Sequence, residues 1–230
     1  MSISENIAAI RQQIALAAER SGRTAADITL VGASKMNDAA ACREAIAAGI
    51  DALGENRVQE MTQKLAEDAY AGAPLHFIGH LQRNKVKQVV GKAALIQSVG
   101  SVALLDEIEK TAEKLSLVQD ILLEVNIGRE AAKSGFAPEK VLPAAEASLE
   151  RTHVRVRGLM TIPPADAQRD ANFRYFQEVQ ALYVDMNQKL FHNELEYLSM
   201  GMSGDYEDAI RAGATMVRVG SAIFGARHYN

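Results

Sequence analysis

Eight short apolar segments alternate with stretches of helical periodicity along the 230-residue chain, and this alternation limits the fold more than any other feature. The apolar segments cover residues 28–35, 51–56, 75–79, 94–99, 120–126, 154–160, 195–199 and 215–219. Apolar residues at helical spacing begin at Ile3, before the first segment, and return between each later pair of segments. Such an alternation implies parallel strands joined by right-handed crossovers.

Eight strand and helix repeats predict a single (β/α)8 TIM barrel, somewhat shorter than the typical ~250 residues. A doubly wound open sheet is the alternative, but it is expected to carry a G-x-G-x-x-G fingerprint after its first strand. The sequence from Gly32 reads Gly-Ala-Ser-Lys-Met-Asn, which lacks that pattern. The pair Pro163-Pro164 brings no shift in composition, so we expect one domain over residues 1–230.

The composition indicates an ordinary soluble protein. The chain is 48% hydrophobic and 23% charged, with a formal charge of -4, which favours neither disorder nor a nucleic-acid surface. No stretch approaches the roughly 20 apolar residues of a membrane span. Cys42 is the single cysteine, so the chain forms no internal disulfide. We therefore expect a cytoplasmic protein without nucleic-acid or membrane partners.

The first apolar segment ends at Lys35, which we expect at the mouth of the barrel. Ile28, Leu30 and Val31 favour burial, whereas Asp38 offers a helix N-cap and a return to water. Partial desolvation would lower the pKa of the lysine and prepare it to form a Schiff base with an aldehyde. The alternative is an exposed lysine at a strand end.

Polar residues close most of the predicted strands, and a barrel would bring them to one rim, where such folds hold their active sites. They are Lys35, Asn56, His76, Asn126, Thr161, Ser199, Ser203 and Arg218. The segments 199–204 and 218–222 follow the last two strands and combine glycines with hydroxyls, as phosphate-binding loops of barrels do. A lysine for an aldehyde and a cradle for a phosphate together suggest pyridoxal 5'-phosphate, with Asn56 and Arg218 within reach of its ring.

Other candidate sites have less support. His76 and His80 are four residues apart but lack the helical frame of a zinc site, so no metal is expected. A basic cluster without aromatic residues is typical of a solvated helix face, although a partner surface remains an alternative. It contains Arg83, Lys85, Lys87 and Lys92. Glu55 and Asp205 lie near the rim, where each could act as an acid or base or cap a helix.

Seven ordered motifs run along the chain: Val31-Gly-Ala-Ser-Lys35, Gly54-Glu-Asn-Arg-Val-Gln-Glu60, His76-Phe-Ile-Gly-His-Leu-Gln-Arg-Asn-Lys85, Lys133-Ser-Gly135, Gly158-Leu-Met-Thr-Ile-Pro163, Leu198-Ser-Met-Gly-Met-Ser203 and Val217-Arg-Val-Gly-Ser-Ala-Ile-Phe-Gly225. Together they resemble the motifs of the pyridoxal phosphate homeostasis proteins, a family whose fold is similar to the N-terminal barrel of alanine racemase, of pyridoxal phosphate fold type III. After the lysine, Met36-Asn-Asp38 stands where Thr-Lys-Pro is common in the family.

The resemblance implies a Schiff base on Lys35, phosphate contacts from small residues, and Arg218 at the ring nitrogen. The complete expected cofactor-binding set is Lys35, Asn56, Ser199, Met202, Ser203, Arg218, Gly220 and Ser221. It also implies a monomeric cytoplasmic protein that holds pyridoxal phosphate reversibly for vitamin B6 homeostasis, without established catalysis and therefore without catalytic residues. Its expected partners are the cofactor and pyridoxal-phosphate-dependent apoenzymes.

Two other functions remain open. One is a pyridoxal-phosphate-dependent amino-acid racemase, for which Tyr206 or Tyr229 would have to supply a second base. The other is an aldolase-like barrel in which Lys35 attacks a sugar phosphate directly. An arginine at the ring nitrogen leaves the pyridine unprotonated and makes the ring a weaker electron sink, which disfavours carbanion chemistry.

Overall fold

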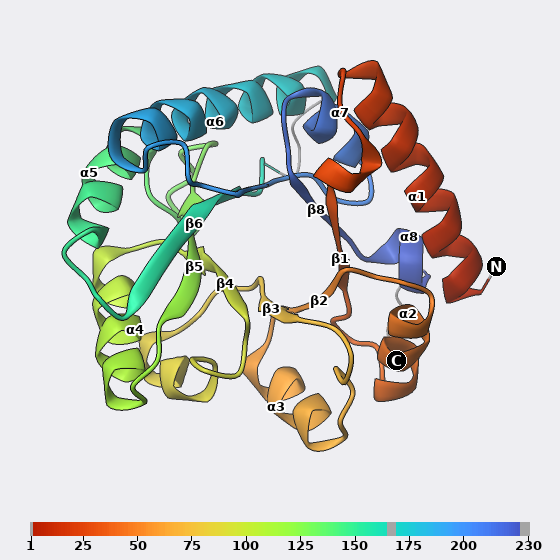
Figure 1. Ribbon diagram of the computed structural model, residues 1–230, viewed down its shortest axis with the longest axis horizontal. Helices are drawn as coiled ribbons and strands as arrows, with labels where there is room; N and C mark the ends of the chain where they lie inside the picture. The colour runs from red at the N-terminus through yellow and green to blue at the C-terminus, as the bar shows by residue number, and fades with distance from the viewer. Residues whose placement is uncertain (1, 165–168, 226–230) are drawn as a thin grey trace.

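Eight parallel strands close into a barrel in the computed structural model, which describes residues 2–164 and 169–225. The strands are β1 (Thr29–Ala33), β2 (Ala52–Glu55), β3 (Leu75–Phe77), β4 (Leu95–Val99), β5 (Gln119–Val125), β6 (Val154–Thr161), β7 (Tyr197–Ser199) and β8 (Met216–Val219). Each strand pairs with its neighbours in chain order, and β8 pairs with β1 to complete the ring (Figure 1). The predicted TIM barrel is confirmed and the open-sheet alternative is wrong.

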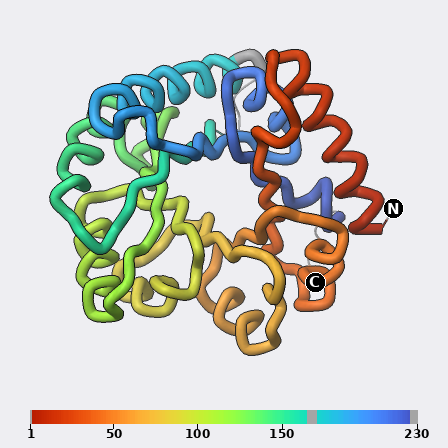
Figure 2. The backbone as a smooth tube through the Cα atoms, viewed as in Figure 1, coloured from red at the N-terminus to blue at the C-terminus, as the bar shows by residue number. Residues whose placement is uncertain are grey.

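Helices surround the strands and connect them. They are α1 (Ile3–Arg20), α2 (Ala39–Ala47), α3 (Val58–Ala66), α4 (Val102–Lys114), α5 (Pro138–Ser148), α6 (Arg169–Leu190), α7 (Tyr206–Arg211) and α8 (Ser221–Phe224), with 3-10 helices η1 (Ala25–Asp27) and η2 (Arg83–Gln88). The helix predicted around Val86 is thus a 3-10 helix. The first helix packs beside α2, α7 and α8, so the N-terminal and C-terminal parts of the chain lie next to each other (Figure 2).

The strands bury two separate apolar layers, one inside the barrel and one beneath the helices. The inner layer is small and consists of Val31, Ala52, Leu95, Leu122, Met160 and Met216, with Tyr197 against it. Successive side chains of a strand point to opposite faces, so a residue two positions further on shares the same face. Two positions beyond Leu95, Leu122 and Met216 stand polar residues. The barrel interior therefore changes from apolar to polar toward the carboxyl ends of its strands.

A β-bulge in β6 lets one strand serve both apolar layers. The register with β5 pairs Ile121 with Val156 but Leu122 with Gly158, which leaves one extra residue in β6. Val156 consequently belongs to the outer layer and Met160 to the inner one, although they are an even number apart. Gly158 has φ +151°, and a Cβ there would lie 1.7 Å from the carbonyl oxygen of Tyr197. Only glycine fits this bulge.

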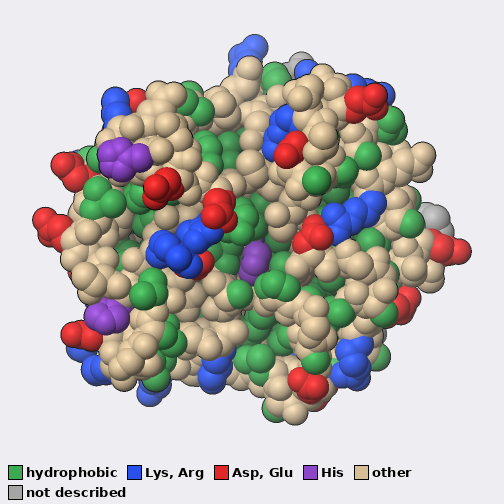
Figure 3. Space-filling model, viewed as in Figure 1, with side chains coloured by type: hydrophobic (Ala, Val, Ile, Leu, Met, Phe, Trp, Pro, Cys, Tyr) green, Lys and Arg blue, Asp and Glu red, His purple; other side chains and the backbone are tan. Residues whose placement is uncertain are grey.

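Acidic and basic side chains lie next to one another on the face shown in Figure 3. Arg11 bonds Asp51 at 2.7 Å, and Arg155 bonds Asp120 at 2.7 Å. Ion pairs of such partly exposed groups contribute little net stability. Within the described residues, no helix has the length and apolar character needed to cross a membrane.

Candidate functional site

A cavity of about 250 Å³ opens where β8 and β1 meet, at the carboxyl ends of the strands. Its lining includes six of the eight predicted cofactor-binding residues: Lys35, Met202, Ser203, Arg218, Gly220 and Ser221. Lys35 follows β1 and is half-buried, as expected of a residue at the barrel mouth. Asp38 caps α2 by accepting a hydrogen bond from the N–H of Ala41, which sets the turn around the lysine.

The loops after β7 and β8 are bound together at this cavity. The hydroxyl oxygen of Ser203 accepts hydrogen bonds from the N–H groups of Gly220 at 3.2 Å and Ala222 at 3.5 Å. The N–H of Arg218 donates to the carbonyl of Gly201 at 3.0 Å. These bonds present glycines, hydroxyls and main-chain groups in one concave surface. Such a surface suits a small anion.

Arg218 is the cation beneath this surface and is only 3% exposed. Its guanidinium donates to the hydroxyl oxygen of Ser199 at 2.5 Å and to the carbonyl of Thr161 at 2.8 Å. Burial lowers the pKa of Arg218 to about 10, with opposing effects from Asp205 and Glu124. The guanidinium therefore remains charged at neutral pH, and its hydrogen bonds to Ser199 of β7 and Thr161 of β6 fix its orientation.

A chain of hydrogen bonds continues from Arg218 into the barrel. The Ser199 hydroxyl donates to Gln97 Oε1 at 2.6 Å, and Gln97 Nε2 donates to His76 Nδ1 at 3.0 Å. Along this series of hydrogen bonds, each group donates to the next one further from the guanidinium. The pattern assigns the imidazole proton to Nε2 and keeps His76 neutral. Burial lowers the pKa of His76 to about 4, which agrees with the neutral form.

Two predicted cofactor residues do not line the cavity. Ser199 is fully buried, and its hydroxyl bonds to Arg218 and Gln97 inside the barrel. Asn56 follows β2, and its Oδ1 is buried without a hydrogen-bond partner in the described part of the chain. A buried amide oxygen without a partner costs free energy, so a ligand with a donor group would satisfy it.

The remaining rim residues have structural roles. Asn126 organises the loop after β5, since its Nδ2 donates to the carbonyl of Glu130 at 2.8 Å and its Oδ1 accepts from the N–H of Glu130 at 3.1 Å. The Thr161 hydroxyl donates to the carbonyl of Val125 at 2.8 Å. His76 lies inside the barrel, as described above.

One of the two acidic candidates requires correction. Glu55 is fully buried and paired with Lys64 at 2.6 Å, so it is neither a rim acid nor a helix cap. Asp205 is the N-cap residue of α7, and its side chain accepts the N–H of Met202 at 2.7 Å in the loop after β7. Glu124, missed by the sequence analysis, lies two residues beyond Leu122 on the inner face of β5. Burial raises its pKa against the opposing effects of Ser134, His80 and Arg218, and its Oε2 has no partner among the described residues.

The metal and basic-cluster predictions concern residues that the structure separates. His76 is buried in the interior, whereas His80 is exposed beside a cavity of about 390 Å³ that Arg83 and Lys133 also line. Over the described ranges, no three metal-ligating side chains cluster. Lys92 of the basic cluster lines a different cavity, and Arg83, Lys87 and Lys92 are all exposed.

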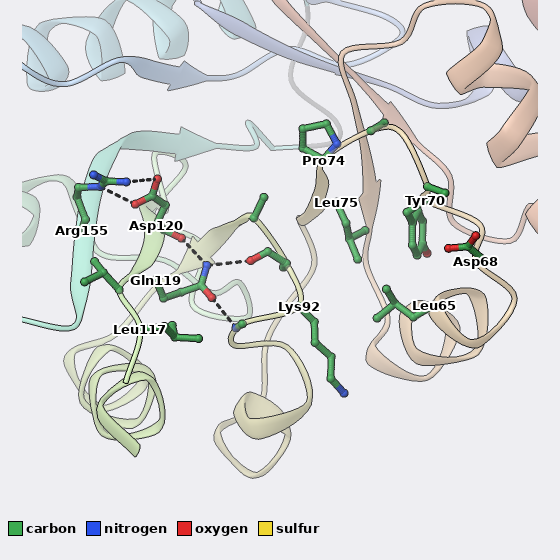
Figure 4. A pocket seen from close by; sticks show the side chains of 16 residues that line it. Leu65, Asp68, Tyr70, Pro74, Leu75, Lys92, Leu117, Gln119, Asp120 and Arg155 are labelled. Atoms are coloured by element: carbon green, nitrogen blue, oxygen red, sulfur yellow. Dashed lines mark hydrogen bonds and ion pairs between the residues drawn. The ribbon is translucent and has the colours of Figure 1, made fainter. Parts of the chain in front are cut away.

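That cavity, of about 630 Å³, lies at the opposite end of the barrel, where β3, β4 and β5 begin (Figure 4). Gln119 and Asp120, two of its polar residues, already have hydrogen-bond or ion-pair partners. Gln119 accepts the N–H of Gly91 at 3.0 Å and donates to the carbonyls of Ala93 and Asp120, while Asp120 pairs with Arg155. The arrangement accounts for its buried polar atoms without a ligand.

Comparison with known proteins extends these observations. Residues 6–228 match the family model of the alanine racemase N-terminal domain. The chain is similar to the pyridoxal phosphate homeostasis protein of Aquifex aeolicus, with 42% identity over 229 residues that cover all of both chains. The protein of the same name from Pseudomonas aeruginosa is 40% identical over 99% of this chain and 97% of that protein.

Solved structures show the same relationship. PipY of Synechococcus elongatus, solved with pyridoxal phosphate bound, superposes with a TM-score of 0.85 and 32% identity over 97% of this chain and 100% of that one. Its structure without the cofactor gives a TM-score of 0.88. Alanine racemase of Clostridium difficile gives 0.68 at 17% identity over 89% of this chain and 53% of the racemase, which indicates a shared fold.

The buried His76 should make the protein less stable in mild acid. Its pKa falls from 6.5 in the unfolded chain to about 4 in the fold. As the pH drops below about 6.5, the unfolded chain therefore takes up the proton first, and stability is lost until the pH reaches the folded pKa. Between pH 7 and pH 5 we expect His76 to account for about 2 kcal/mol of lost stability. Urea unfolding at both pH values should show a smaller loss in His76→Asn. An equal loss in wild type and variant would contradict the neutral assignment.

Proposed function

Because the chain belongs to the family of pyridoxal phosphate homeostasis proteins, built on the barrel of the alanine racemase N-terminal domain, we propose that it binds pyridoxal 5'-phosphate and acts in vitamin B6 homeostasis. The observation that carries the proposal is the convergence of Lys35, Arg218 and the two small-residue loops in one cavity. An amine, a fixed cation and an anion cradle correspond to the three chemically distinct parts of this cofactor.

The residues present fit the cofactor. Ser203 ties the loops together through its oxygen and retains a hydroxyl hydrogen that can be donated to a phosphate. Gly220 also lines the cavity, and a Cβ there would make an ordinary 3.4 Å contact with Ala33. Asn56 lies outside this cavity, and its buried Oδ1 has no hydrogen-bond donor among the described residues. Lys35, on the β1 side, is the residue that we propose to form the Schiff base.

When bound, the cofactor supplies an aldehyde and an electron-withdrawing ring. The chain supplies the amine of Lys35 for the aldehyde, a neutralising cradle for the phosphate, and Arg218 for the ring nitrogen. A guanidinium that remains charged would favour an unprotonated ring nitrogen, since the arginine can only donate to it. The ring is then a poor electron sink, which favours storage of the cofactor over amino-acid chemistry.

We further propose that the protein is a cytoplasmic monomer without catalytic activity and that pyridoxal-phosphate-dependent apoenzymes receive its cofactor. The buried, unpaired thiol of Cys42 is consistent with a reducing compartment. For reversible retention, the covalent bond and the phosphate-binding loops must jointly keep the cofactor bound without promoting a reaction of the cofactor.

A racemase remains the second candidate because of Glu124. It is a largely buried carboxyl group on the inner face of the barrel, and burial raises its pKa toward the range useful to an acid or base. The tyrosines offer less. Tyr206 is largely buried, burial raises its pKa, and Tyr229 lies outside the described residues.

Borohydride treatment of the protein loaded with pyridoxal 5'-phosphate should fix one pyridoxyl group on Lys35. Reduction converts a lysine Schiff base to a stable amine, so peptide mass mapping identifies the residue. Lys35→Arg is the matched control, since it retains the positive charge but not the reactive primary amine. A tag confined to another lysine of the wild-type chain would refute the role of Lys35.

Ser221→Asp should weaken binding of pyridoxal 5'-phosphate about tenfold to a hundredfold, because a carboxylate would face the phosphate. Binding of pyridoxal, which lacks the phosphate, should change little. Gln12→Glu on the exposed face of α1 adds the same charge away from the cavity and serves as the control. Spectroscopic titration of all three proteins measures the effect. Equal losses for both ligands would exclude these loops as the phosphate site.

The loaded protein should not racemise amino acids at an enzymatic rate. Incubation with L-alanine and other L-amino acids in deuterated water tests this, because racemisation exchanges the α-proton for deuterium. D-isomer formation with α-deuterium in wild type, lost in both Lys35→Arg and Glu124→Gln, would establish the racemase instead.

A further inference from the structure

The backbone on both sides of Lys35 is held by two charged side chains of α3. Lys64 Nζ donates to the carbonyl oxygen of Ser34 at 2.8 Å, and Glu60 Oε2 accepts the N–H of Met36 at 2.7 Å. Glu60 and Lys64 are four residues apart and therefore lie on one face of the helix. Lys64 thus holds the residue before Lys35, and Glu60 holds the residue after it.

The anchor before Lys35 is completely enclosed. Glu55 Oε1 accepts hydrogen bonds from Lys64 Nζ at 2.6 Å, from the Ser34 hydroxyl at 2.6 Å and from Tyr70 OH at 3.1 Å. Ser34 and Glu55 are fully buried, and Lys64 is 5% exposed. A buried ion pair is seldom better for stability than an apolar replacement. Stability alone therefore does not explain why charges stand at this position.

The anchor after Lys35 holds an unusual backbone conformation. Met36 has φ +61°, in the left-handed region that residues other than glycine seldom adopt. Its side chain is 54% exposed, so packing of the methionine does not impose this conformation. The hydrogen bond from the N–H of Met36 to Glu60 contributes to holding the backbone in this conformation. Asn37 Nδ2 closes the turn by donating to the carbonyl of Lys35 at 3.0 Å.

We infer that Glu60 and Lys64 are positioning residues for Lys35, and that the pair directs its amine toward the aldehyde of a ligand seated in the β7–β8 loops. The inference rests on the proposed function. Neither residue lines the cavity, so both act through the backbone of residues 34–36. Loosening that backbone should impair the covalent step, in which the lysine nitrogen bonds to the aldehyde carbon and the carbonyl oxygen leaves as water. It should leave phosphate binding intact.

Two ligands separate these steps. Pyridoxal 5'-phosphate can use both the cradle and Lys35, whereas pyridoxine 5'-phosphate carries an alcohol in place of the aldehyde and uses the cradle alone. In Glu60→Ala we expect binding of pyridoxal 5'-phosphate to weaken about tenfold and its rate of covalent attachment to fall, with binding of pyridoxine 5'-phosphate unchanged. Glu60→Gln should restore both values, because its amide oxygen can still accept the N–H of Met36.

Controls keep structural damage apart from loss of positioning. Gln59→Ala alters an exposed neighbour on α3 and should behave as wild type. The double variant Glu55→Gln, Lys64→Met removes both buried charges together and tests the other anchor, with the same loss expected for pyridoxal 5'-phosphate alone. Equal losses for the two ligands, or no loss for either, would overturn the inference. A wild-type protein that binds neither ligand would instead overturn the proposed function.

Discussion

The buried charge of Arg218 is the interaction on which the candidate site depends. A guanidinium removed from water is tolerated only if its donors are satisfied, and here Ser199 and Thr161 satisfy two of them. Ser199 is held in turn by Gln97, and Gln97 contacts His76. Side chains from β3, β4, β7 and β8 therefore share one hydrogen-bond chain. Moving the guanidinium would leave several buried polar groups without partners, so the cation is preorganised before any ligand arrives.

The polar side chains inside the barrel stand two residues beyond the apolar ones along the same strands. Val31, Leu95, Leu122 and Met216 fill the interior, and the next inward residues toward the carboxyl ends include Gln97, Glu124 and Arg218. The bulge at Gly158 keeps β6 in the same scheme, since without the extra residue Met160 would share the outer face with Val156. It also sets the register at the end of β6, where the Thr161 carbonyl meets Arg218. A backbone irregularity thus supports the electrostatics of the site.

The sequence predicted the barrel, its strand order and six of the cavity residues, because period-two and helical spacing are local signals and strand ends converge in this fold. It could not predict which partner each polar side chain takes. Ser199 and Ser203 are both serines of the same short segment. Ser199 bonds to Arg218 inside the barrel, whereas Ser203 joins the loops after β7 and β8. Glu55 is the last residue of β2 and Glu124 is the last but one of β5, but strand parity directs their side chains to opposite faces. The roles of Gln97, His76 and Lys64 depend on pairings across strands and helices, which spacing alone does not encode.

The two walls of the cavity are stabilised by different means, and the difference bears on reversible binding. On the β7–β8 wall, loops bond to each other and form a surface that is already complete. On the β1 wall, Lys35 stands beside Met36, whose left-handed conformation costs about 1–3 kcal/mol and persists because neighbouring contacts hold it. Under the proposed function, an anion would seat on the β7–β8 loops independently of the lysine, while a covalent bond at Lys35 would depend on a turn that α3 contacts. A protein with the proposed function would benefit from this separation, because hydrolysis of a Schiff base at Lys35 need not disturb a phosphate on the β7–β8 loops, and departure of that phosphate need not distort the barrel.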